Sequence, residues 1–400
     1  MTAARGLRRL TVLTAAAATL AAVIAVVPAT AQLSDTGTVG TALTSADDEP
    51  LLFTGGVEAG DAHSVGWTAD GELYAWGRNQ EGQLGLGTAD HDRLHPTRVA
   101  LPAGRQVVDV CAGADATVAL TADDGVYAWG GSGWANNSAT PRRTDFFDTL
   151  GDPVVKVEAG AYFYLALTAS GRLYSWGIVD SRLGRPVSDP NGPPALVQAQ
   201  SVAARDVTTM SAGRFHAAAI VDGQVVAWGS TTYAGVTGVV VTGIEGEPVE
   251  VAAGNDVTVV RTAEGRVYVA RGSQATLVDG ISGIDGVAVS SPVLTGGSPS
   301  FWAWRGAPSG RRTLYVWGDD SHGQLGLGIP GLTHVETPLM VGLPVGSVPL
   351  RVAGGGGHAL YESTTGQYAA TGLNDRGQLG DGTRDSRSMF VYVIPISRWP

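Results

Sequence analysis

The chain has 400 residues, a formal net charge of −11 at pH 7 and one cysteine, Cys111. An acidic chain whose arginines are scattered, with only short pairs such as Arg142-Arg143 and Arg311-Arg312, is a poor partner for nucleic acid or an anionic membrane, so these classes are excluded. A single cysteine excludes an internal disulfide, and we expect Cys111 to pack as a small apolar residue at a strand end.

The N-terminal stretch has the pattern of a secretory signal peptide. A basic segment ending in Arg9 precedes an apolar run over residues 10–27, and Ala29-Thr30-Ala31 supplies a small-x-small cleavage pattern. We expect residues 1–31 to be removed on export, and the paired arginines give a weak indication of the twin-arginine route. The alternative is an uncleaved membrane anchor, because the run is nearly long enough to span a bilayer. Residues 32–49 are polar and without periodicity, which predicts a flexible spacer.

From about residue 50 the chain is a series of repeats, and residues 76–87 show the motif in full: Trp-Gly, four residues, then Gly-Gln-Leu-Gly-Leu-Gly. The same spacing returns at residues 317–328 and 371–382, with Thr371 in place of the tryptophan in the last copy. Four further copies keep only the first half of the motif or a trace of it, the weakest being Arg271-Gly272. The chain therefore contains seven copies.

A second glycine precedes the Trp-Gly glycine by 16 to 18 residues in every copy but the sixth. There the best match is residues 287–291, which implies an insertion at residues 306–312 behind Trp302 and Trp304. The structural anchors of the repeats are Gly60, Trp76, Gly77, Gly113, Trp129, Gly130, Gly160, Trp176, Gly177, Gly213, Trp228, Gly229, Trp317, Gly318, Gly355 and Gly372.

This period and its glycine and aromatic punctuation predict one supersecondary unit per repeat. In the second copy, alternating apolar residues on either side of an Asp-Gly turn predict antiparallel strands, with a fourth strand in the variable stretch that follows. We therefore predict an all-β fold, a closed seven-bladed β-propeller of four-stranded antiparallel blades over residues 50–400. Residues 50–53 or 389–394 could supply a strand that joins the first blade to the last. The predicted repeats are 57–106, 107–153, 154–206, 207–248, 249–286, 287–349 and 350–395.

The anchors have structural explanations. A glycine at a strand end permits positive φ or a close backbone approach, and a tryptophan before it is expected at a contact between blades. His63, His216 and His358 all follow an anchor glycine by three residues, which predicts hydrogen bonds inside the blade rather than catalysis.

The pattern Ala-Gly-x-x-His, Asp-Gly and Trp-Gly-x-Asn-x-x-Gly-Gln-Leu-Gly-x-Gly, at residues 59–63, 70–71 and 76–87, resembles the repeat of the regulator of chromosome condensation family. The resemblance covers residues 50–395 and implies a seven-bladed propeller. Eukaryotic nuclear members of that family exchange nucleotide on a small GTPase, and a secreted bacterial branch inhibits β-lactamases through aromatic-rich loops. Repeats two to five depart from the pattern by losing the Gly-Gln-Leu-Gly turn, which weakens the inheritance of a particular partner more than that of the fold.

Catalytic motifs are not found. His91 and His95 stand four residues apart in a loop-like segment without a third metal ligand. The glycine-rich residues 82–87 and 354–357 lack the Lys-Ser/Thr and the helix of a phosphate loop, and no Gly-x-Ser-x-Gly elbow occurs. We expect no catalytic residue, no metal site and no cofactor.

What remains is a surface. The loops between the first and second strands and between the third and fourth strands share one face of the ring, and aromatic residues interleaved with acidic and amide groups favour protein recognition. Phe215 could also point inward beside His216, as Phe163 would where it replaces a histidine, so we weight Trp134, Tyr162 and Tyr233 more. The candidate binding residues are Trp134, Tyr162, Arg214, Phe215, Tyr233, Asp319, Asp320 and His322.

Several functions fit this pattern. The first is a secreted, non-enzymatic, monomeric module that binds an extracellular or cell-envelope protein through one face. The second is a secreted inhibitor of an enzyme such as a β-lactamase. Nucleotide exchange is disfavoured by the signal peptide, because an exported protein would not meet a nuclear or cytosolic GTPase. An extracellular carbohydrate-active enzyme would need paired carboxylates at the central channel, for which Asp61, Asp319 and Asp320 are the candidates.

Overall fold

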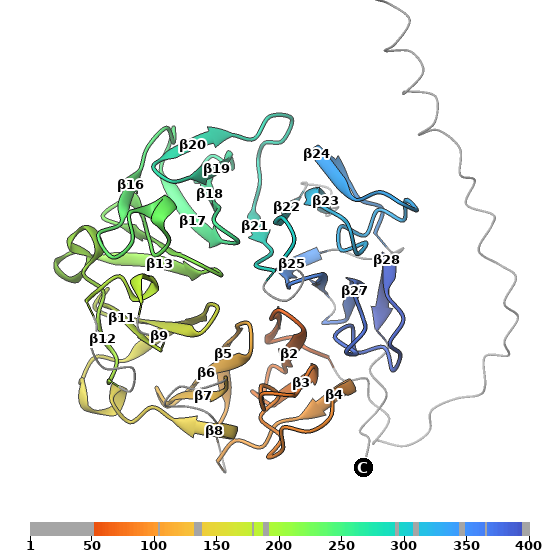
Figure 1. Cartoon of the computed structure of the whole chain (residues 1–400), viewed down its shortest axis with the longest axis horizontal. Coiled ribbons are helices and arrows are strands. Elements are labelled where there is room, and N and C mark those ends of the chain that lie inside the picture. Colours follow the sequence, from red (N-terminus) through yellow and green to blue (C-terminus); the bar gives the residue numbers. More distant parts are fainter. Residues whose placement is uncertain are drawn as a thin grey trace, which may run out of the picture. The chain divides into compact units, whose positions relative to one another are not determined.

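Seven four-stranded antiparallel sheets stand around a central channel in this computed structural model (Figure 1). This architecture confirms the predicted all-β, seven-bladed propeller. The structure describes residues 52–102, 105–131, 138–177, 180–186, 192–292, 296–306, 312–343, 349–364 and 366–393. Helices in these ranges are short 3₁₀ turns, and none is long and apolar enough to cross a membrane.

The first four blades follow one another along the chain. Blade one is β1 (Gly56–Ala59), β2 (His63–Trp67), β3 (Leu73–Gly77) and β4 (Arg93–Arg98). Blade two is β5 (Val107–Ala112), β6 (Ala116–Thr121), β7 (Val126–Gly130) and β8 (Ser138–Arg143). Blade three is β9 (Val154–Ala159), β10 (Phe163–Thr168), β11 (Leu173–Gly177) and β12 (Ala195–Leu196). Blade four is β13 (Val207–Ala212), β14 (Ala217–Val221), β15 (Gln224–Trp228) and β16 (Val239–Val241).

The remaining blades complete the ring. Blade five is β17 (Pro248–Ala253), β18 (Thr258–Thr262), β19 (Val267–Arg271) and β20 (Gln274–Leu277). Blade six is β21 (Gly286–Val289), β22 (Ser300–Gly306), β23 (Arg312–Asp319) and β24 (His334–Met340). Blade seven is β25 (Pro349–Gly354), β26 (His358–Ser363), β27 (Tyr368–Gly372) and β28 (Arg387–Val393). The 3₁₀ turns are η1 (Phe147–Thr149), η2 (Ser181–Leu183), η3 (Ala199–Ala204) and η4 (Thr231–Tyr233).

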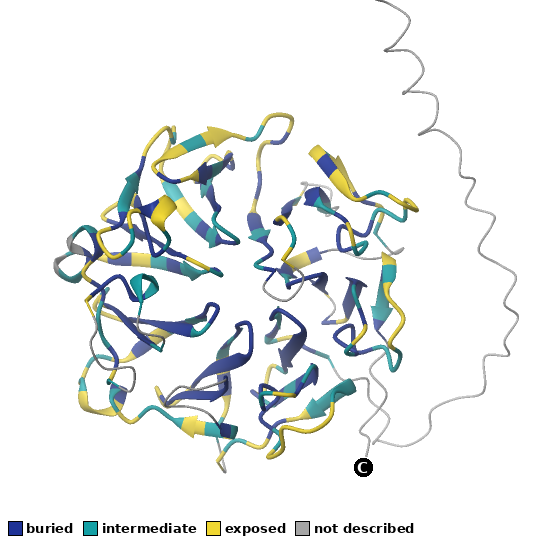
Figure 2. Ribbon diagram, viewed as in Figure 1, coloured by how far each residue is buried: buried dark blue, intermediate teal, exposed yellow. Residues whose placement is uncertain are grey.

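Burial follows the position of a strand in its blade (Figure 2). The second strands are buried along their whole length in blades one, two, three, four and seven, because neighbouring blades cover both of their faces. The first strands line the channel and alternate, and a bulge near Val107 turns Val108, which is 50% exposed, out of the core and brings Asp109 to the channel wall.

The core lies between blades rather than inside one sheet. In one cluster, Leu165 and Leu173 of blade three pack with Ala219, Val226 and Trp228 of blade four, and all five side chains are buried. Such sheet-on-sheet packing makes each blade depend on its neighbours for the burial of its apolar faces.

The ring closes by packing and not by a shared strand, so the predicted joining strand is wrong. Residues 387–393 form the fourth strand of blade seven itself, and among the described residues no strand of blade one pairs with blade seven. Instead, Phe53 lies between the two blades, where its ring stacks on Trp76 at 5.5 Å and lies 5.4 Å from Tyr368. Its backbone N–H donates to the Gly366 carbonyl at 3.0 Å.

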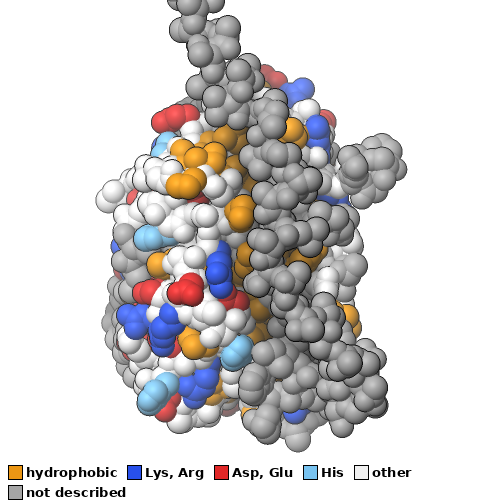
Figure 3. All heavy atoms as spheres, turned by 90° about the vertical axis from the view of Figure 1, so that its right-hand side faces the viewer, with side chains coloured by type: hydrophobic (Ala, Val, Ile, Leu, Met, Phe, Trp, Pro, Cys, Tyr) orange, Lys and Arg blue, Asp and Glu red, His pale blue; other side chains and the backbone are white. Residues whose placement is uncertain are grey.

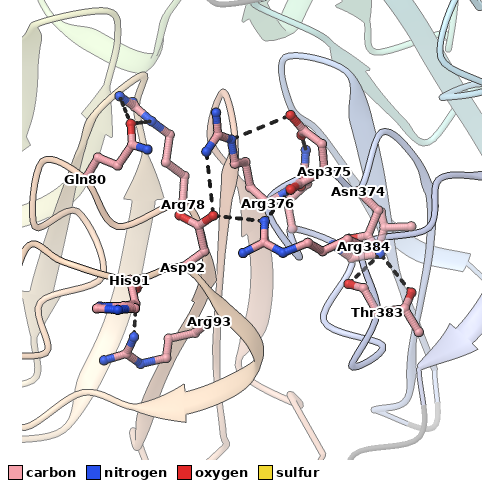
Figure 4. Close-up of polar contacts among 12 residues, drawn as sticks. Arg78, Gln80, His91, Asp92, Arg93, Asn374, Asp375, Arg376, Thr383 and Arg384 are labelled. Carbon is pink, nitrogen blue, oxygen red and sulfur yellow. Dashed lines mark hydrogen bonds and ion pairs between the residues drawn. The ribbon is translucent and has the colours of Figure 1, made fainter.

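An ion network also spans the closing junction (Figure 4). The Asp92 carboxylate of blade one, whose side chain is 7% exposed, accepts a hydrogen bond from Arg384 of blade seven at 3.1 Å. The Arg376 guanidinium lies 3.8 Å from the same carboxylate. Because the carboxylate is shielded from solvent, this network is expected to stabilise closure more than an exposed pair would.

Candidate functional site

The anchor glycines that follow the first strand of a blade, such as Gly60 and Gly113, form a belt around one end of the channel. We call this end of the channel the mouth. The residue after an anchor donates its N–H to the anchor carbonyl of the next blade, as Asp61 does to Gly113 at 3.1 Å and Arg214 does to Gly254 at 3.2 Å. A Cβ atom on Gly113 would lie 2.5 Å from the next blade's carbonyl oxygen, so only glycine fits. The belt passes through Ser290 in blade six, which confirms that residues 287–291 hold the missing anchor.

The glycines of the Trp-Gly pairs have positive φ, the other role predicted for a glycine at a strand end. Gly77, Gly130 and Gly229 have φ values of 93°, 77° and 127°, a region that favours glycine. Because Gly77 pairs with His63, the first anchor and the Trp-Gly turn lie at the same end of the blade. The loops at this end form the mouth face.

The anchor histidines bond between blades, and the prediction of bonds inside a blade is wrong. Each Nε2 atom contacts a hydroxyl of the following blade, including the contact that closes the ring. The pairs are His63 with Thr117 at 3.0 Å, His216 with Thr258 at 2.9 Å and His358 with Ser64 at 2.9 Å.

The hydroxyl contacts define the tautomer of these histidines. Ser64 Oγ donates its only hydrogen to the Gln378 carbonyl at 2.8 Å, so it must accept from Nε2–H of His358. Nδ1 is then an unprotonated nitrogen, and in the three anchor histidines it is buried without a hydrogen-bond partner among the described residues. Burial lowers the pKa of His63, His216 and His358 to about 3, so all three are neutral at pH 7.

Tryptophan Nε1 atoms complete the same junctions. Trp76 donates to the Gln378 carbonyl at 3.0 Å and Trp129 donates to the Gln83 carbonyl at 2.9 Å. The carbonyls of Gln83 and Gln378 in two of the intact Gly-Gln-Leu-Gly turns therefore accept from both the hydroxyl and the tryptophan of the next blade. These contacts confirm that the repeat tryptophans lie between blades.

Blade three keeps this geometry with an altered sequence. Trp228 Nε1 donates to the Arg182 carbonyl at 3.0 Å, and Gly184 has a φ of 61° beside the same tryptophan. Ser181-Arg182-Leu183-Gly184 thus replaces the Gly-Gln-Leu-Gly turn, one residue earlier in the repeat, which corrects the prediction that repeat three lost it. The retained Leu-Gly pair was the signal in the sequence.

Two predicted binding residues are structural instead. Tyr233 is fully buried because η4 turns it inward, where it stacks on His216 at 4.4 Å and donates to the Ala270 carbonyl at 3.1 Å. Asp320 is 3% exposed and accepts the Leu325 N–H at 2.8 Å, the role that asparagine has in the other intact turns. Burial raises the pKa of Asp320 to about 6.

Two further candidates in blade six are engaged locally. Asp319 accepts the Gln324 side-chain amide at 2.7 Å and the Ser321 hydroxyl at 2.9 Å. His322 is half-buried, and its backbone N–H donates to the Gln324 side chain at 2.9 Å. Trp134 lies outside the described residues.

Tyr162, Arg214 and Phe215 do come together on the mouth face, and with Arg182 they make up what we call the mouth cluster. Arg182 lies 5.9 Å from the Tyr162 ring centroid, and Arg214 lies 4.5 Å from that of Phe215. Phe215 is 36% exposed. Arg214 also donates to the Pro292 carbonyl at 2.8 Å, which extends it from blade four to the loop behind β21 of blade six.

The cluster is held rigidly. Tyr162 has a φ of 72°, a strained conformation for a bulky residue. Burial, with the carboxylates of Asp115 and Asp61 nearby, raises the pKa of Tyr162 and keeps its hydroxyl protonated. Arg182 donates to the Ala161 carbonyl at 2.9 Å and to the Arg214 carbonyl at 3.3 Å, so it connects the loops of blades three and four.

The channel is a cavity of about 610 Å³ lined by the first strands of all seven blades. Carboxylates that the repeat pattern did not predict there border it as well: Glu58, Asp109, Glu158, Glu250 and Asp285. Asp61 also borders it, whereas Asp319 and Asp320 do not, so the carboxylate set proposed from sequence for a carbohydrate-active enzyme is not assembled.

Cys111 lies near the end of β5 and packs against an apolar cluster, as predicted, and it also borders this channel. Its Sγ lies 3.7 Å from a Glu158 carboxylate oxygen, and burial raises the pKa of the thiol well above its usual range. Within the described ranges, no group of three His, Cys, Asp or Glu side chains is placed to hold a metal ion. His91 is 81% exposed beside Asp90.

The flank of blades six and seven offers a different surface (Figure 3). Apolar side chains lie there among arginines and carboxylates, the most exposed being Met340, Met389 and Ile329 at 69%, 54% and 51%. Met340 lies in β24, Met389 lies in β28 and Ile329 lies in the loop between β23 and β24.

Comparison with known proteins agrees with this geometry. Residues 70–120 match the model of the regulator of chromosome condensation (RCC1) repeat, and a second model of that repeat matches residues 56–83, 107–134 and 154–182. The chain carries RCC1 repeats. The ultraviolet-B receptor UVR8 of Arabidopsis thaliana is 41% identical over 80 residues, which are 20% of this chain and 18% of the receptor.

Other similarities are partial or concern the fold alone. The human probable E3 ubiquitin-protein ligase HERC4 is 37% identical over 105 residues, 24% of this chain and 10% of the ligase. The RCC1-repeat match thus spans a small part of each of these relatives. The crystal structure of human WBSCR16 superimposes with a TM-score of 0.66 at 18% identity, covering 80% of this chain and 93% of that one. The CRINKLY ectodomain of the Arabidopsis thaliana receptor kinase ACR4 gives 0.50 at 16%, covering 83% and 97%.

Proposed function

We propose that this RCC1-repeat propeller is an exported, non-enzymatic interaction module that binds an extracellular or cell-envelope protein through its mouth face. The observation that carries the proposal is the mouth cluster. It exposes the Phe215 ring beside the half-buried Arg214, residue types that are enriched at protein interfaces, on a loop fixed by the glycine belt. A rigid surface loses little entropy on binding, which favours affinity.

Export is the second part of the proposal. It rests on the basic segment, apolar run and Ala-x-Ala pattern of residues 1–31. The same leader makes exchange of nucleotide on an intracellular GTPase the less favoured function for this chain.

A secreted enzyme inhibitor, for instance of a β-lactamase, is the narrower alternative. Tyr162 and Phe215 are aromatic residues on one face, as that activity requires, but Tyr233 is removed from the set by its burial. The mouth cluster therefore offers fewer aromatic contacts than the sequence predicted.

The test compares two variants of the full chain, each purified in folded form. Arg214→Ala with Phe215→Ala removes the centre of the mouth cluster, and Met340→Ala with Met389→Ala removes more exposed side chains on the flank as the control. Partners captured from culture fluid and envelope extract are identified, purified and titrated against each variant.

We expect the mouth variant to bind a partner at least tenfold more weakly than the parent, as for the loss of an interface hot spot. The flank variant should bind as the parent does. Equal binding by the parent and the mouth variant would reject the mouth face, and weaker binding by the flank variant alone would place the interface on blades six and seven. A β-lactamase among the partners would support the inhibitor.

A further inference from the structure

The first strands of blades two, three, four, five and seven contain the same register shift near their start. In each, the second residue of the strand is skipped in the pairing with the second strand. The skipped residues are Val108, Val155, Thr208, Val249 and Leu350. Each directly precedes a residue that lines the channel, at the end of the strand opposite the anchor glycine. They therefore stand around the opening of the channel opposite the mouth, and we call them the lower rim.

The lower rim exposes apolar side chains. Its three valines and its leucine are between 38% and 52% exposed. The register shift does not itself require an apolar residue, since Thr208 occupies the same position in blade four. Exposed apolar side chains that gather at one end of the ring are typical of a surface that another molecule covers.

Carboxylates outnumber arginines beside the rim residues of blades two to five. There the turn between the second and third strands bonds to the start of the first strand, as Ala263 N–H does to the Glu247 carbonyl at 2.9 Å. These turns and strand starts carry Asp123, Asp124, Asp152, Asp206, Asp222, Glu247 and Glu264, with Arg105, Arg172, Arg205 and Arg266. Three of the arginines are already in ion pairs, for example Arg205 with Asp222 at 2.7 Å. The exposed carboxylates of this set that make no ion pair with a described residue are Asp124, Asp206, Glu247 and Glu264.

A hollow beside Val155 combines the two kinds of surface. It is a cavity of about 720 Å³ that extends from Val154 to the carboxylates of Asp124 and Asp152, and the buried Phe147 ring forms part of its lining. Four carboxylates and one arginine line this hollow. Such a lining fits the aliphatic stem and the charged head of a lysine or arginine side chain.

We propose that the lower rim of blades two to five binds a segment of a partner protein that carries both apolar and basic side chains. Its apolar side chains contact the exposed valines, and its lysines or arginines pair with the carboxylates around them. Leu350 does not belong to this surface, because Arg351 follows it and Arg312 donates to the Pro349 carbonyl at 3.1 Å. The proposal does not depend on the mouth cluster, which lies at the other end of the channel.

The test titrates the full chain with a short fluorescent peptide in which lysine and leucine alternate, and fluorescence anisotropy measures binding. Two control peptides replace either every leucine by serine or every lysine by glutamate. The rim variant is Val108→Thr with Val155→Thr and Val249→Thr, which copies the residue of blade four and should therefore fold. The matched control variant, Met340→Ala with Met389→Ala, removes exposed apolar side chains elsewhere.

We expect the lysine–leucine peptide to bind the parent at least tenfold more tightly than either control peptide does. The rim variant should lose this difference, whereas the control variant and the mouth variant Arg214→Ala with Phe215→Ala should keep it. A mouth variant that still binds this peptide separates the lower rim from the mouth face, whatever the outcome for the mouth partner.

Equal binding of the lysine–leucine peptide by the parent and the rim variant would overturn the proposal. Equally tight binding of the lysine–serine peptide would also overturn it, because charge alone would then explain the attraction. Self-association of the parent that is lost in the rim variant, measured by sedimentation, would assign the lower rim to a second copy of this chain instead.

Discussion

The junction between blades four and five allows one buried histidine to be removed by copying another junction of the same ring. Phe163 of blade three occupies the histidine position, and Ala217 of blade four occupies the hydroxyl position, and both are fully buried. The double variant His216→Phe with Thr258→Ala transfers this apolar pair to the next junction. Because both partners change together, no ring nitrogen at the junction is left without its partner. The Tyr233 hydroxyl loses its contact with Thr258 at 3.3 Å but keeps its bond to the Ala270 carbonyl.

The variant should change the pH dependence of the unfolding free energy by a defined amount. The pKa of His216 is about 3 in the folded chain and ordinarily 6.5, so below pH 6.5 the unfolded state binds one more proton at this site. The stabilisation that neutral His216 contributes is fully present above pH 6.5 and is lost as the pH falls toward 3. Between pH 7 and pH 5, His216 should cost the parent about 2 kcal/mol of unfolding free energy, because each pH unit contributes about 1.4 kcal/mol.

Urea unfolding at pH 7 and pH 5 measures both proteins. The drop in unfolding free energy should be smaller in the variant by about 2 kcal/mol, whatever its stability at pH 7, since the change of packing is the same at both pH values. Burial raises the pKa values of Glu58 and Asp109, which acts in the opposite direction but equally in both proteins. An equal drop in the two proteins would refute the neutral, buried histidine.

Three further experiments test two other parts of the structure and the cleavage of the signal peptide. Gly113→Ala should lower the unfolding free energy by more than about 1 kcal/mol because the next blade's carbonyl occupies the space, whereas Gly342→Ala, with open space around it, should change thermal stability little. Trp129→Phe should cost about 1–3 kcal/mol in urea unfolding, because it leaves a buried carbonyl with one donor fewer. Protein recovered from culture fluid should begin at Gln32 by N-terminal sequencing, and an intact leader would contradict export with cleavage.

The spacing of the repeats was sufficient to predict the blades. Glycine and tryptophan recur at fixed intervals because every blade repeats the same close approaches, so the fold could be predicted even where the Gly-Gln-Leu-Gly letters change. The partner of each anchor histidine was also present in the sequence. Ser64, Thr117 and Thr258 stand four residues after the anchor of the following repeat, but a contact between repeats is not visible in the pattern of one.

The site was harder to predict because it depends on the direction of single side chains. The sequence predicts Tyr233 and Tyr162 equally as exposed binding residues. In the structure, η4 turns Tyr233 into the core, and a left-handed backbone holds Tyr162 on the mouth face. Asp320 resembles an exposed loop carboxylate until the turn it caps is seen. Asp109 reaches the channel because a bulge at Val108 shifts the register of β5. The same shift recurs at Val155 of β9 and Val249 of β17, so it belongs to the repeat and is not visible in the pattern of one strand.

The repeats divide into two groups by what they do for the ring. Blades one, six and seven keep the full turn, and their last glycines bond to the outer strand of the next blade, as Gly382 of blade seven does to Leu94 of blade one at 3.0 Å. Closure has no shared strand. The turn of blade seven connects the two ends of the ring, and the turns of blades one and six connect the junctions on either side of it.

Blades three and four contact the next blade through a different kind of turn. Blades three and four replace the full turn with the 3₁₀ turns η2 and η4, which still contact the next blade through Arg182 and Tyr233. Consecutive blades need fewer hydrogen bonds between them than the two ends of the ring do, because the chain itself already connects them. Loss of the consensus turn there frees loop positions for other residues. The mouth cluster lies in these two blades, and Arg182 of η2 is the member that the changed turn contributes to it.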